Sequence, residues 1–325
     1  MNTFGNNFRI SIFGESHGEC VGVTVDGCPA GIPLCADDFT ADLERRRAGR
    51  KGTSQRVEDD YPDIVSGIFN DCTTGAPITV VFENRNARSE DYPGFNVYPR
   101  PGHADFVAVR KFDDFADHRG GGHFSGRLTL PLVAAGVIAK KVISPMSVHA
   151  SLVEVGGSAD PDQWLPMLQQ AQADQDSLGG IVGCSASNVP VGLGEPFFDS
   201  AEALISHMMF SIPAVKAIEF GAGFEAARMK GSEHNDVLVS PDGTTRTNHS
   251  GGISGGITNG NELKFRIAVK PTASIGREQD TLNLNTGEPA KITIKGRHDV
   301  CIALRIPAVV EACTAIVLAD LFRRA

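Results

Sequence analysis

A short pattern occurs twice in the chain, at a constant offset of 161 residues (182 − 21). Residues 21–32 read Val-Gly, six residues, then Pro-x-Gly-Ile, and residues 182–193 read Val-Gly, six residues, then Pro-x-Gly-Leu. Each copy is typical of a strand and a tight turn, followed by a helix that starts with an acidic residue. A repeated unit of this kind predicts a duplicated fold in which both copies contribute to one core.

The rest of the chain mixes strand and helix patterns throughout. Alternating apolar residues predict strands at 9–13, 21–25, 64–68, 78–82, 148–155, 181–187, 215–220, 263–269 and 292–295. Helical spacing predicts helices at 42–47, 104–115, 128–142, 161–173, 200–210 and 307–321. Because no Ser/Pro/Gly-rich linker separates the copies, we expect one layered α+β domain over residues 1–325, with pseudo-repeat halves of about 1–145 and 146–325.

Composition excludes several classes of function. The 30 Lys and Arg against 39 Asp and Glu give a net charge of −9, which argues against a nucleic-acid surface. We find no run of 18 apolar residues and no secretory leader, so we expect no membrane span. The seven cysteines form no Cys-x-x-Cys pair, and we expect neither a disulfide framework nor a metal site in a reducing cytoplasm.

The segment Phe13-Gly14-Glu15-Ser16-His17-Gly18 directly follows an expected strand. A histidine at a strand end can project into a cleft, where it donates or accepts a proton near neutral pH. His17 is therefore a candidate acid–base residue, and a turn whose histidine caps backbone groups is the simpler interpretation. The spacing also looks like the nucleophile elbow of an α/β-hydrolase, but that elbow continues into a helix, whereas a strand follows here.

Basic residues gather after the first expected helix. Between Glu44 and Arg56 they are Arg45, Arg46, Arg47, Arg50, Lys51 and Arg56. Cations are favourable at the C-terminal end of a helix, which gives one interpretation of the cluster. Guanidinium groups also bind phosphate and carboxylate in a bidentate way, so a pocket for a polyanionic small molecule is the other. This segment alone does not decide between them.

Two neighbouring segments combine glycines with ionisable side chains at the starts of expected helices. Residues 100–105 read Arg-Pro-Gly-His-Ala-Asp, and residues 117–127 contain three consecutive glycines followed by Ser125 and Arg127. Exposed N–H groups, a positive helix end and a guanidinium together suit a phosphate group. The segments match neither a Walker loop nor a Gly-x-Gly-x-x-Gly turn. A flexible linker between helices is the alternative.

Two later loops, residues 248–256 and 270–274, are rich in small and hydroxyl-bearing residues. Their N–H and hydroxyl groups would suit a ligand with both a flat ring and a phosphate. Residues 295–299 (Lys-Gly-Arg-His-Asp) precede the last expected helix. Asp299 can cap that region or orient a base in a site, and both interpretations stay open.

These motifs occur in the order seen in chorismate synthases, and the chain resembles that family from Phe8 to about Asp320. The resemblance rests on seven motifs in register, at residues 13–18, 45–47, 100–105, 119–122, 248–249 with the paired glycines that follow, 270–272 and 296–299. It implies a layered β-α-β sandwich around an internal pseudo-repeat, in agreement with the duplicated pattern. It also implies a lyase that makes chorismate from 5-enolpyruvylshikimate 3-phosphate by 1,4-anti elimination of phosphate, in the shikimate pathway of aromatic amino acid biosynthesis.

The resemblance also implies ligands and assembly. The family reaction needs reduced FMN although it has no net redox change, and some members reduce their own flavin with NADPH. Members are typically homotetramers. We therefore expect a cytoplasmic flavoprotein with a small phosphorylated substrate and with no nucleic-acid or membrane partner. A substrate with one phosphate and two carboxylates would explain a basic cluster in an acidic chain.

By resemblance, the motifs assign roles to residues of this chain. His17 is the candidate acid at the leaving phosphate, His103 the residue that protonates or stabilises reduced flavin, and Asp299 the carboxylate near the flavin. The expected substrate-binding residues are Arg46, Lys51, Arg119 and Arg127. The expected FMN contacts are His123, Phe124, Ser125, Pro213, Ala214, Gly255, Lys270, Pro271, Thr272, Ala273, Ser274 and Arg297.

The chain departs from the family pattern at a few positions. His123-Phe124-Ser125 stands where many members have Arg-Ser-Ser, and Pro213-Ala214 where Asn-Ala is common. The loop after Arg47 is one residue shorter than in some members, which makes Arg50 the alternative to Lys51. Two other functions remain as alternatives: a flavin oxidoreductase that transfers hydride, and a non-catalytic protein that binds a phosphosugar.

Overall fold

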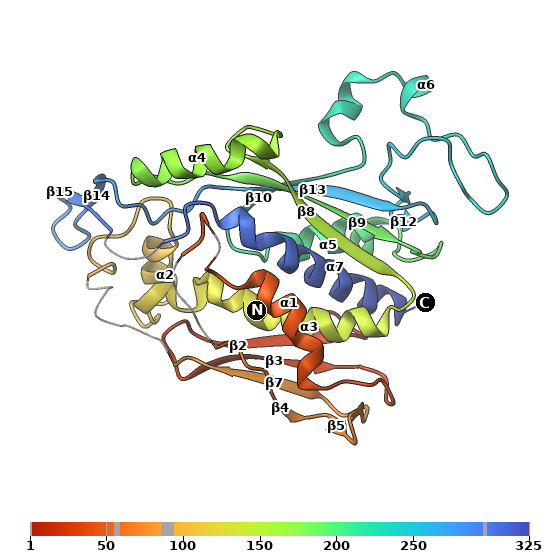
Figure 1. Ribbon diagram of the computed structural model, residues 1–325, viewed down its shortest axis with the longest axis horizontal. Coiled ribbons are helices and arrows are strands. Elements are labelled where there is room, and N and C mark those ends of the chain that lie inside the picture. The colour runs from red at the N-terminus through yellow and green to blue at the C-terminus, as the bar shows by residue number, and fades with distance from the viewer. Residues whose placement is uncertain (1, 50, 55–58, 86–93, 295–297, 325) are drawn as a thin grey trace.

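The computed structural model describes residues 2–49, 51–54, 59–85, 94–294 and 298–324. Two antiparallel sheets enclose a layer of helices (Figure 1). The first sheet has the strand order β1-β2-β3-β7-β4 and the second the order β10-β13-β9-β8. This arrangement confirms the α+β class and the layered β-α-β sandwich that the sequence predicts.

Each sheet comes from one half of the chain, whereas the helix layer combines both halves. The first sheet consists of β1 (Thr3–Phe4), β2 (Arg9–Gly14), β3 (Cys20–Asp26), β7 (Ile78–Glu83) and β4 (Asp63–Ser66). The second sheet consists of β10 (Val215–Phe220), β13 (Leu263–Val269), β9 (Gly180–Ser187) and β8 (Ser147–Val155). The helices of the middle layer are α1 (Thr40–Arg46), α3 (Thr129–Val142), α5 (Ala201–Met209) and α7 (Ile306–Phe322).

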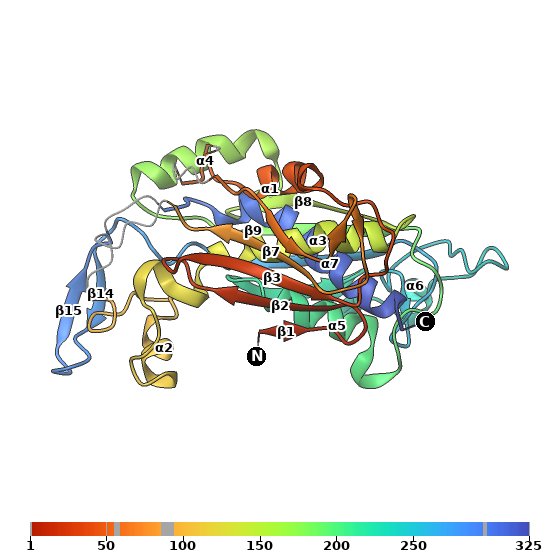
Figure 2. The same ribbon diagram turned by 90° about the horizontal axis from the view of Figure 1, so that it is seen from below.

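Smaller elements lie around this sandwich, as the turned view in Figure 2 shows. The helices among them are α2 (Asp105–Lys111), α4 (Pro161–Ala173) and α6 (Gly231–His234). Short hairpins are formed by β5 (Ile68–Phe69) with β6 (Cys72–Thr73), β11 (Ile253–Ser254) with β12 (Ile257–Thr258), and β14 (Gln279–Leu282) with β15 (Pro289–Ile292).

Most predicted elements are present, and those at 161–173, 215–220 and 263–269 have the predicted bounds. Three need correction. The strand expected at 64–68 ends at Ser66, because Gly67 takes a left-handed φ of 84° against Ile78. The helix expected at 104–115 ends at Lys111, since Asp113 and Asp114 have φ of 48° and 62°. In place of a strand at 292–295, β15 ends at Ile292, where its pairing with β14 ends, and residue 295 lies outside the described residues.

The two long helices α3 and α7 pack directly on each other in the middle layer. Twelve of the 14 residues of α3 and 15 of the 17 residues of α7 are buried, so both helices are covered on nearly all sides. A Cβ atom on Gly136 would lie 2.2 Å from the Cβ of Ala312. The helices approach this closely because Gly136 has no side chain.

One buried carboxylate connects this helix pair to its neighbours. Glu311 in α7 accepts hydrogen bonds from Arg45 (2.6 and 2.7 Å), from Lys140 (3.1 Å) and from the backbone N–H of Ala150 (2.9 Å). Burial raises the pKa of Glu311, but these bonds outweigh it and hold the pKa below its usual value. The ionised Glu311 therefore joins α1, α3 and β8 to α7.

The two sequence copies form the same local structure. In the first copy, Thr73 Oγ1 accepts from the N–H of Ile32 (2.9 Å) and donates to the carbonyl of Pro29 (2.6 Å). In the second, Thr258 Oγ1 accepts from the N–H of Leu193 (2.9 Å) and donates to the carbonyl of Pro190 (2.7 Å). A buried threonine thus holds the Pro-x-Gly turn in both copies.

The last helical segment, Ile302–Phe322, is long and apolar enough to cross a membrane by length and composition. In this fold, however, 78% of its most apolar window is buried inside the protein. The composition of α7 is thus accounted for by its place between α3 and the second sheet.

The Gly136 contact predicts the effect of a single methyl group. Gly136→Ala should lower the free energy of unfolding by about 1–3 kcal/mol, because the helices must separate to admit the new Cβ. Gly231→Ala is the matched control, since a Cβ there meets no atom within 4 Å. Urea unfolding of both variants measures the difference, and equal midpoints would contradict this account of the helix pair.

Candidate active site

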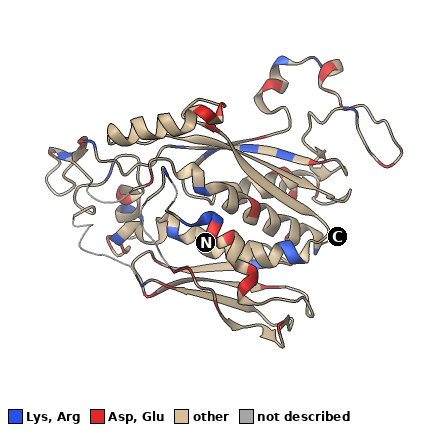
Figure 3. Ribbon diagram, in the orientation of Figure 1, with Lys and Arg blue, Asp and Glu red and all other residues tan. Residues whose placement is uncertain are grey.

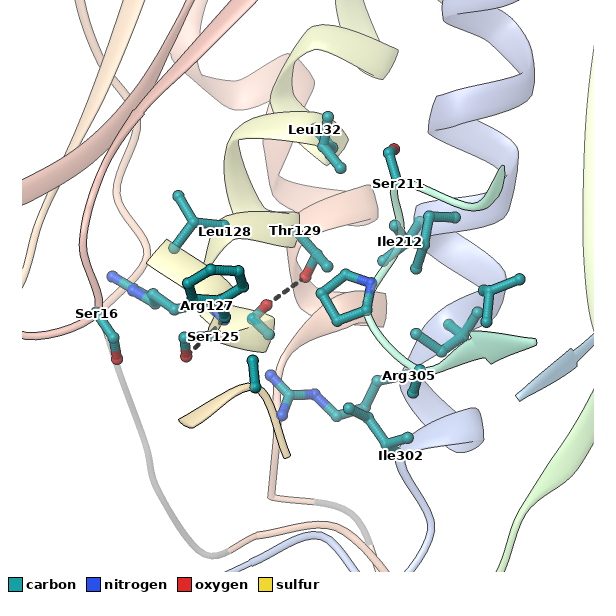
Figure 4. Close-up of a pocket in the computed structure, with 18 of the residues that line it drawn as sticks. Ser16, Ser125, Arg127, Leu128, Thr129, Leu132, Ser211, Ile212, Ile302 and Arg305 are labelled. Atoms are coloured by element: carbon teal, nitrogen blue, oxygen red, sulfur yellow. Dashed lines mark hydrogen bonds between the residues drawn. The ribbon is translucent and has the colours of Figure 1, made fainter. Parts of the chain in front are cut away.

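A cavity of about 700 Å³ lies where α3 and α7 begin. Figure 4 shows Thr129 and Leu132 of α3, and Ile302 and Arg305 ahead of α7, on its walls. Segments far apart in sequence complete the lining, around residues 3, 47, 102, 125, 213 and 272. The volume is in the range of sites that enclose small molecules and cofactors.

Positive charge dominates the described lining. Against the two acids Asp60 and Asp299 it has seven basic side chains: Arg46, Arg47, Arg100, Arg127, Lys216, Lys270 and Arg305. Figure 3 shows Lys and Arg around the starts of α3 and α7, whereas the bodies of both helices are mostly uncharged. Both helix N-termini add their positive dipole ends. The cavity therefore suits a polyanion although the chain is acidic overall.

Two of the predicted arginines share a carboxylate in the cavity wall. Arg46 Nη1 lies 3.4 Å from Asp60 Oδ2, and Arg127 Nη1 donates to Asp60 Oδ1. Arg46 Nε also donates to Thr129 Oγ1 at 3.0 Å, at the first turn of α3. All three charged groups are buried. Among the described residues of this wall, two cations thus stand against one carboxylate, and a ligand anion can balance the excess positive charge.

The predicted carboxylate Asp299 is held on both oxygens. Oδ1 accepts from the N–H of Ser54 at 2.8 Å, and Oδ2 accepts from Arg305 Nη1 at 3.1 Å. Arg305 Nε in turn donates to the carbonyl of Arg46 at 2.8 Å. Asp299 is therefore fixed at the cavity wall, and Arg305 connects it to Arg46.

The three consecutive glycines form a turn that packs against both candidate histidines. Gly120, Gly121 and Gly122 all have left-handed φ, of 60°, 84° and 53°. A Cβ on Gly120 would lie 2.1 Å from His17 Cε1, and one on Gly121 would lie 3.3 Å from His103 Cε1. Glycine is thus required both by the backbone conformation and by the close approach. His17 is buried behind this turn, and its neighbour Ser16 lines the cavity.

His103 lines the cavity and is tied to a charged pair. Its Nδ1 lies 2.6 Å from Asp105 Oδ1, and Asp105 is bonded at both oxygens to Arg100 (2.7 Å each). Burial raises the pKa of Asp105, but the hydrogen bonds from Arg100 and His103 outweigh it and hold the pKa well below its usual range. The carboxylate is therefore ionised at neutral pH.

The loop at residues 270–274 forms another wall of the cavity. Lys270 Nζ donates to the carbonyl of Gly102, and the N–H of Lys270 donates to the carbonyl of Ala214 at 2.9 Å. Thr272 Oγ1 is buried, with no hydrogen-bond partner in the part of the chain that the structure describes. A buried hydroxyl of this kind is costly unless a ligand or water satisfies it.

A further part of the lining is apolar. It includes Phe4, Ile10, Ile12, Leu128, Leu132, Met208 and Ile212. His207 joins it, with its ring 5.4 Å from the ring of Phe4 in an edge-on arrangement. The cavity therefore combines a polar, positively charged part with an apolar part against which a flat ring can pack.

Most predicted site residues lie around this cavity. The lining contains His103, Asp299, Arg46, Arg127, His123, Phe124, Ser125, Pro213, Ala214, Lys270, Pro271, Thr272, Ala273 and Ser274. His17, Lys51, Arg119 and Gly255 do not line it. Arg119 instead pairs with Asp117 (2.8 Å), and this bond holds the pKa of Asp117 below its usual value. Arg297 lies outside the described residues.

The structure also adds residues that the sequence analysis did not select. Asp60, Arg100 and Arg305 hold the predicted groups, and Arg47 lines the cavity with a buried Nε that has no hydrogen-bond partner among the described residues. Arg47 and Arg100 lie inside the motifs at residues 45–47 and 100–105, so the sequence could have identified them as site residues. Asp60 and Arg305 stand outside them, and their roles depend on which elements meet in the fold.

Comparisons with known proteins agree on one family. The family model described as chorismate synthase matches residues 8–322. A chorismate synthase of Chitinophaga pinensis is 62% identical over 98% of this chain and 96% of its own length, and one of Dehalococcoides mccartyi is 46% identical over 100% and 97%. A solved structure titled as a crystal structure of chorismate synthase superposes with a TM-score of 0.75 at 26% identity, over 98% of this chain and 92% of that one.

Proposed function

This chain belongs to the chorismate synthase family of lyases in aromatic amino acid biosynthesis, and from this premise we propose that the cavity at the start of α3 and α7 is its active site. There the C–O bond to phosphate and one C–H bond of 5-enolpyruvylshikimate 3-phosphate break, and a C=C bond of chorismate forms. The observation that supports this is the gathering of His103, Asp299 and seven basic side chains around one cavity.

The basic wall would bind the substrate anions. The substrate carries one phosphate and two carboxylates, and the helix N-termini with Arg46 and Arg127 provide a positive field for them. Arg46 and Arg127 already share Asp60, whereas Arg47 offers a buried Nε without a partner among the described residues. We therefore add Arg47 to the proposed substrate contacts. Lys51 and Arg119 remain proposals from the family resemblance.

We propose acid–base roles for the three candidate groups, of which His103 and Asp299 line the cavity and His17 does not. His17, behind the glycine turn, would donate a proton to the departing phosphate, which leaves more easily when its charge is reduced. His103 would hold and move a proton at the cavity wall, and Asp299, fixed by Ser54 and Arg305, would take up the proton that the substrate releases.

FMN fits the residues present. The hydroxyl of Thr272, which has no partner among the described residues, lies in the same loop as Lys270 and Ser274. This loop suits a polar or phosphate group, and the apolar lining suits a flat ring. His123, Phe124, Ser125, Pro213 and Ala214 would complete the contacts, with Arg297 and Gly255 added by resemblance. Reduced FMN supplies electron density that no side chain provides, without net redox change.

Three further features of the family are proposed for this chain. We propose a homotetramer, a cytoplasmic location and NADPH as a reductant of the flavin. Oxidation of NADPH measured without substrate tests the last of these. It also distinguishes a chain that reduces its own flavin from one that depends on a separate reductase.

An anaerobic assay tests the proposed reaction and the role of His103. Protein with chemically reduced FMN should form chorismate and inorganic phosphate in equal amounts, and oxidised FMN should give neither. His103→Ala should lower kcat by roughly 10²–10⁴-fold, the range for general acid–base groups. Chorismate absorbance and phosphate release measure both. An unchanged kcat would remove His103 from the mechanism, and tight binding without product would refute the lyase assignment of this cavity.

Arg47→Gln tests the added substrate contact. Loss of a charge-assisted hydrogen bond of about 1.5–3 kcal/mol should raise the Kd for 5-enolpyruvylshikimate 3-phosphate roughly tenfold or more. Arg9→Gln is the matched control, because Arg9 pairs with Asp26 on the surface and does not line the cavity. Isothermal titration without turnover measures both. Equal Kd values for the two variants would show that Arg47 does not hold the substrate.

Thr272→Val tests the flavin contact with little change in shape. Removing the hydroxyl should weaken FMN binding by about tenfold, because one hydrogen bond to a charged group is lost. Thr286→Val, in the exposed turn between β14 and β15, is the control and should bind FMN normally. Fluorescence titration with oxidised FMN gives both Kd values. Tighter FMN binding by Thr272→Val would mean that the hydroxyl faces no ligand.

A further inference from the structure

A chain of hydrogen bonds runs behind His103 along the cavity wall. It passes from His103 to Asp105, from Asp105 to Arg100, and from Arg100 to Ser274. We propose that Asp105 is a positioning residue that accepts the Nδ1 proton of His103 and so leaves Nε2 as the ring atom that exchanges a proton in the cavity. This inference builds on the role proposed above for His103.

The distances decide which ring nitrogen carries the proton. Nδ1 lies 2.6 Å from Asp105 Oδ1 and 3.0 Å from Arg100 Nη2. An ionised carboxylate cannot approach the lone pair of an unprotonated nitrogen this closely without a proton between them, whereas Nδ1–H donating to a carboxylate gives a short charge-assisted bond. A neutral His103 is therefore the Nδ1–H tautomer.

Nε2 remains available on the other side of the ring. It has no hydrogen-bond partner within the described ranges, and the His103 side chain is 21% exposed, at the cavity. Gly121 lies beside this edge of the ring, where a Cβ atom would lie 3.5 Å from Nε2. The absence of a side chain at Gly121 keeps this edge of the imidazole open.

Arg100 fixes Asp105 in the orientation that this requires. Its Nε and Nη2 each donate to a different oxygen of Asp105 at 2.7 Å, and its backbone N–H adds a third bond at 3.0 Å. The guanidinium lies over the ring of Phe95, 4.4 Å from its centroid, and Nη1 donates to Ser274 Oγ at 3.1 Å. Arg100, Asp105 and Ser274 are all buried. The proposed flavin loop and His103 are thus oriented by the same arginine.

Nitrogen NMR of the unmodified protein gives the first test and needs no variant. In the pH range where the ring ¹⁵N signals of His103 no longer change with rising pH, ¹⁵N-histidine labelling should show His103 protonated at Nδ1 and unprotonated at Nε2. The signal is assigned by its loss in His103→Ala. A His103 signal protonated at Nε2 would overturn the proposal, whatever the activity of the protein.

Asp105→Asn then tests the consequence for turnover. The amide can donate to Nδ1, which favours the other tautomer, so kcat should fall roughly 10²-fold, whereas KM for 5-enolpyruvylshikimate 3-phosphate should change less than about threefold. Asp26→Asn is the control, since it also removes a carboxylate from an Asp–Arg pair, but on the surface. In a His103→Ala background, Asp105→Asn should lower kcat less than about twofold further, because both changes act through one group.

The outcomes separate this inference from the role proposed for His103. A kcat of Asp105→Asn within twofold of the unmodified protein, or full additivity with His103→Ala, would overturn it. If Asp105→Asn lowers the urea midpoint but its His103 signal is still protonated at Nδ1, Asp105 has a purely structural role. That result would also overturn the inference. If His103→Ala turns over normally while the NMR signal shows Nδ1–H, the orientation stands and the catalytic role of His103 fails.

Discussion

The close contact between α3 and α7 at Gly136 and Ala312 is the constraint on which the rest of the fold depends. Two helices that are buried on nearly all sides cannot be covered by one sheet, so each needs a sheet on its outer side. The antiparallel sheets supply that cover, and Glu311 joins the layers through Arg45, Lys140 and Ala150. Sheets cover the sides of the helix pair but not its ends, and the cavity lies at one end.

That location decides the electrostatics of the site. Because both helices begin at the cavity, their dipoles add, and the seven basic side chains of the lining are placed where a field already favours anions. The surrounding protein is acidic, with a net charge of −9, so the positive region is local. Asp60 and Asp299 do not neutralise it. They hold Arg46, Arg127 and Arg305 in fixed positions, which lowers the cost of ordering them around a ligand.

The sequence was sufficient for the features that depend on local patterns. Strand alternation, Pro-x-Gly turns and motif order placed the elements, and His103, Arg127 and the 270–274 loop do meet at one cavity. Roles that depend on contacts between distant segments could not be predicted from the sequence. In the sequence, Gly136 does not differ from any other glycine in a helix. Only the fold shows its contact with Ala312. Thr73 and Thr258 make equivalent bonds but are 185 residues apart (258 − 73), not 161, so the repeat offset does not reveal them.

The duplicated turns have a consequence for how the site tolerates change. The copies keep the same threonine bonds, yet their long helices begin with different chemistry: Arg127 and Thr129 stand at the start of α3, and Asp299 and Arg305 stand before α7. Two copies with the same local structure therefore place different groups at the cavity. Each copy supplies groups that its counterpart lacks, so there is no redundancy between them. With the cavity as the proposed active site, damage at either helix start should abolish activity and not halve it.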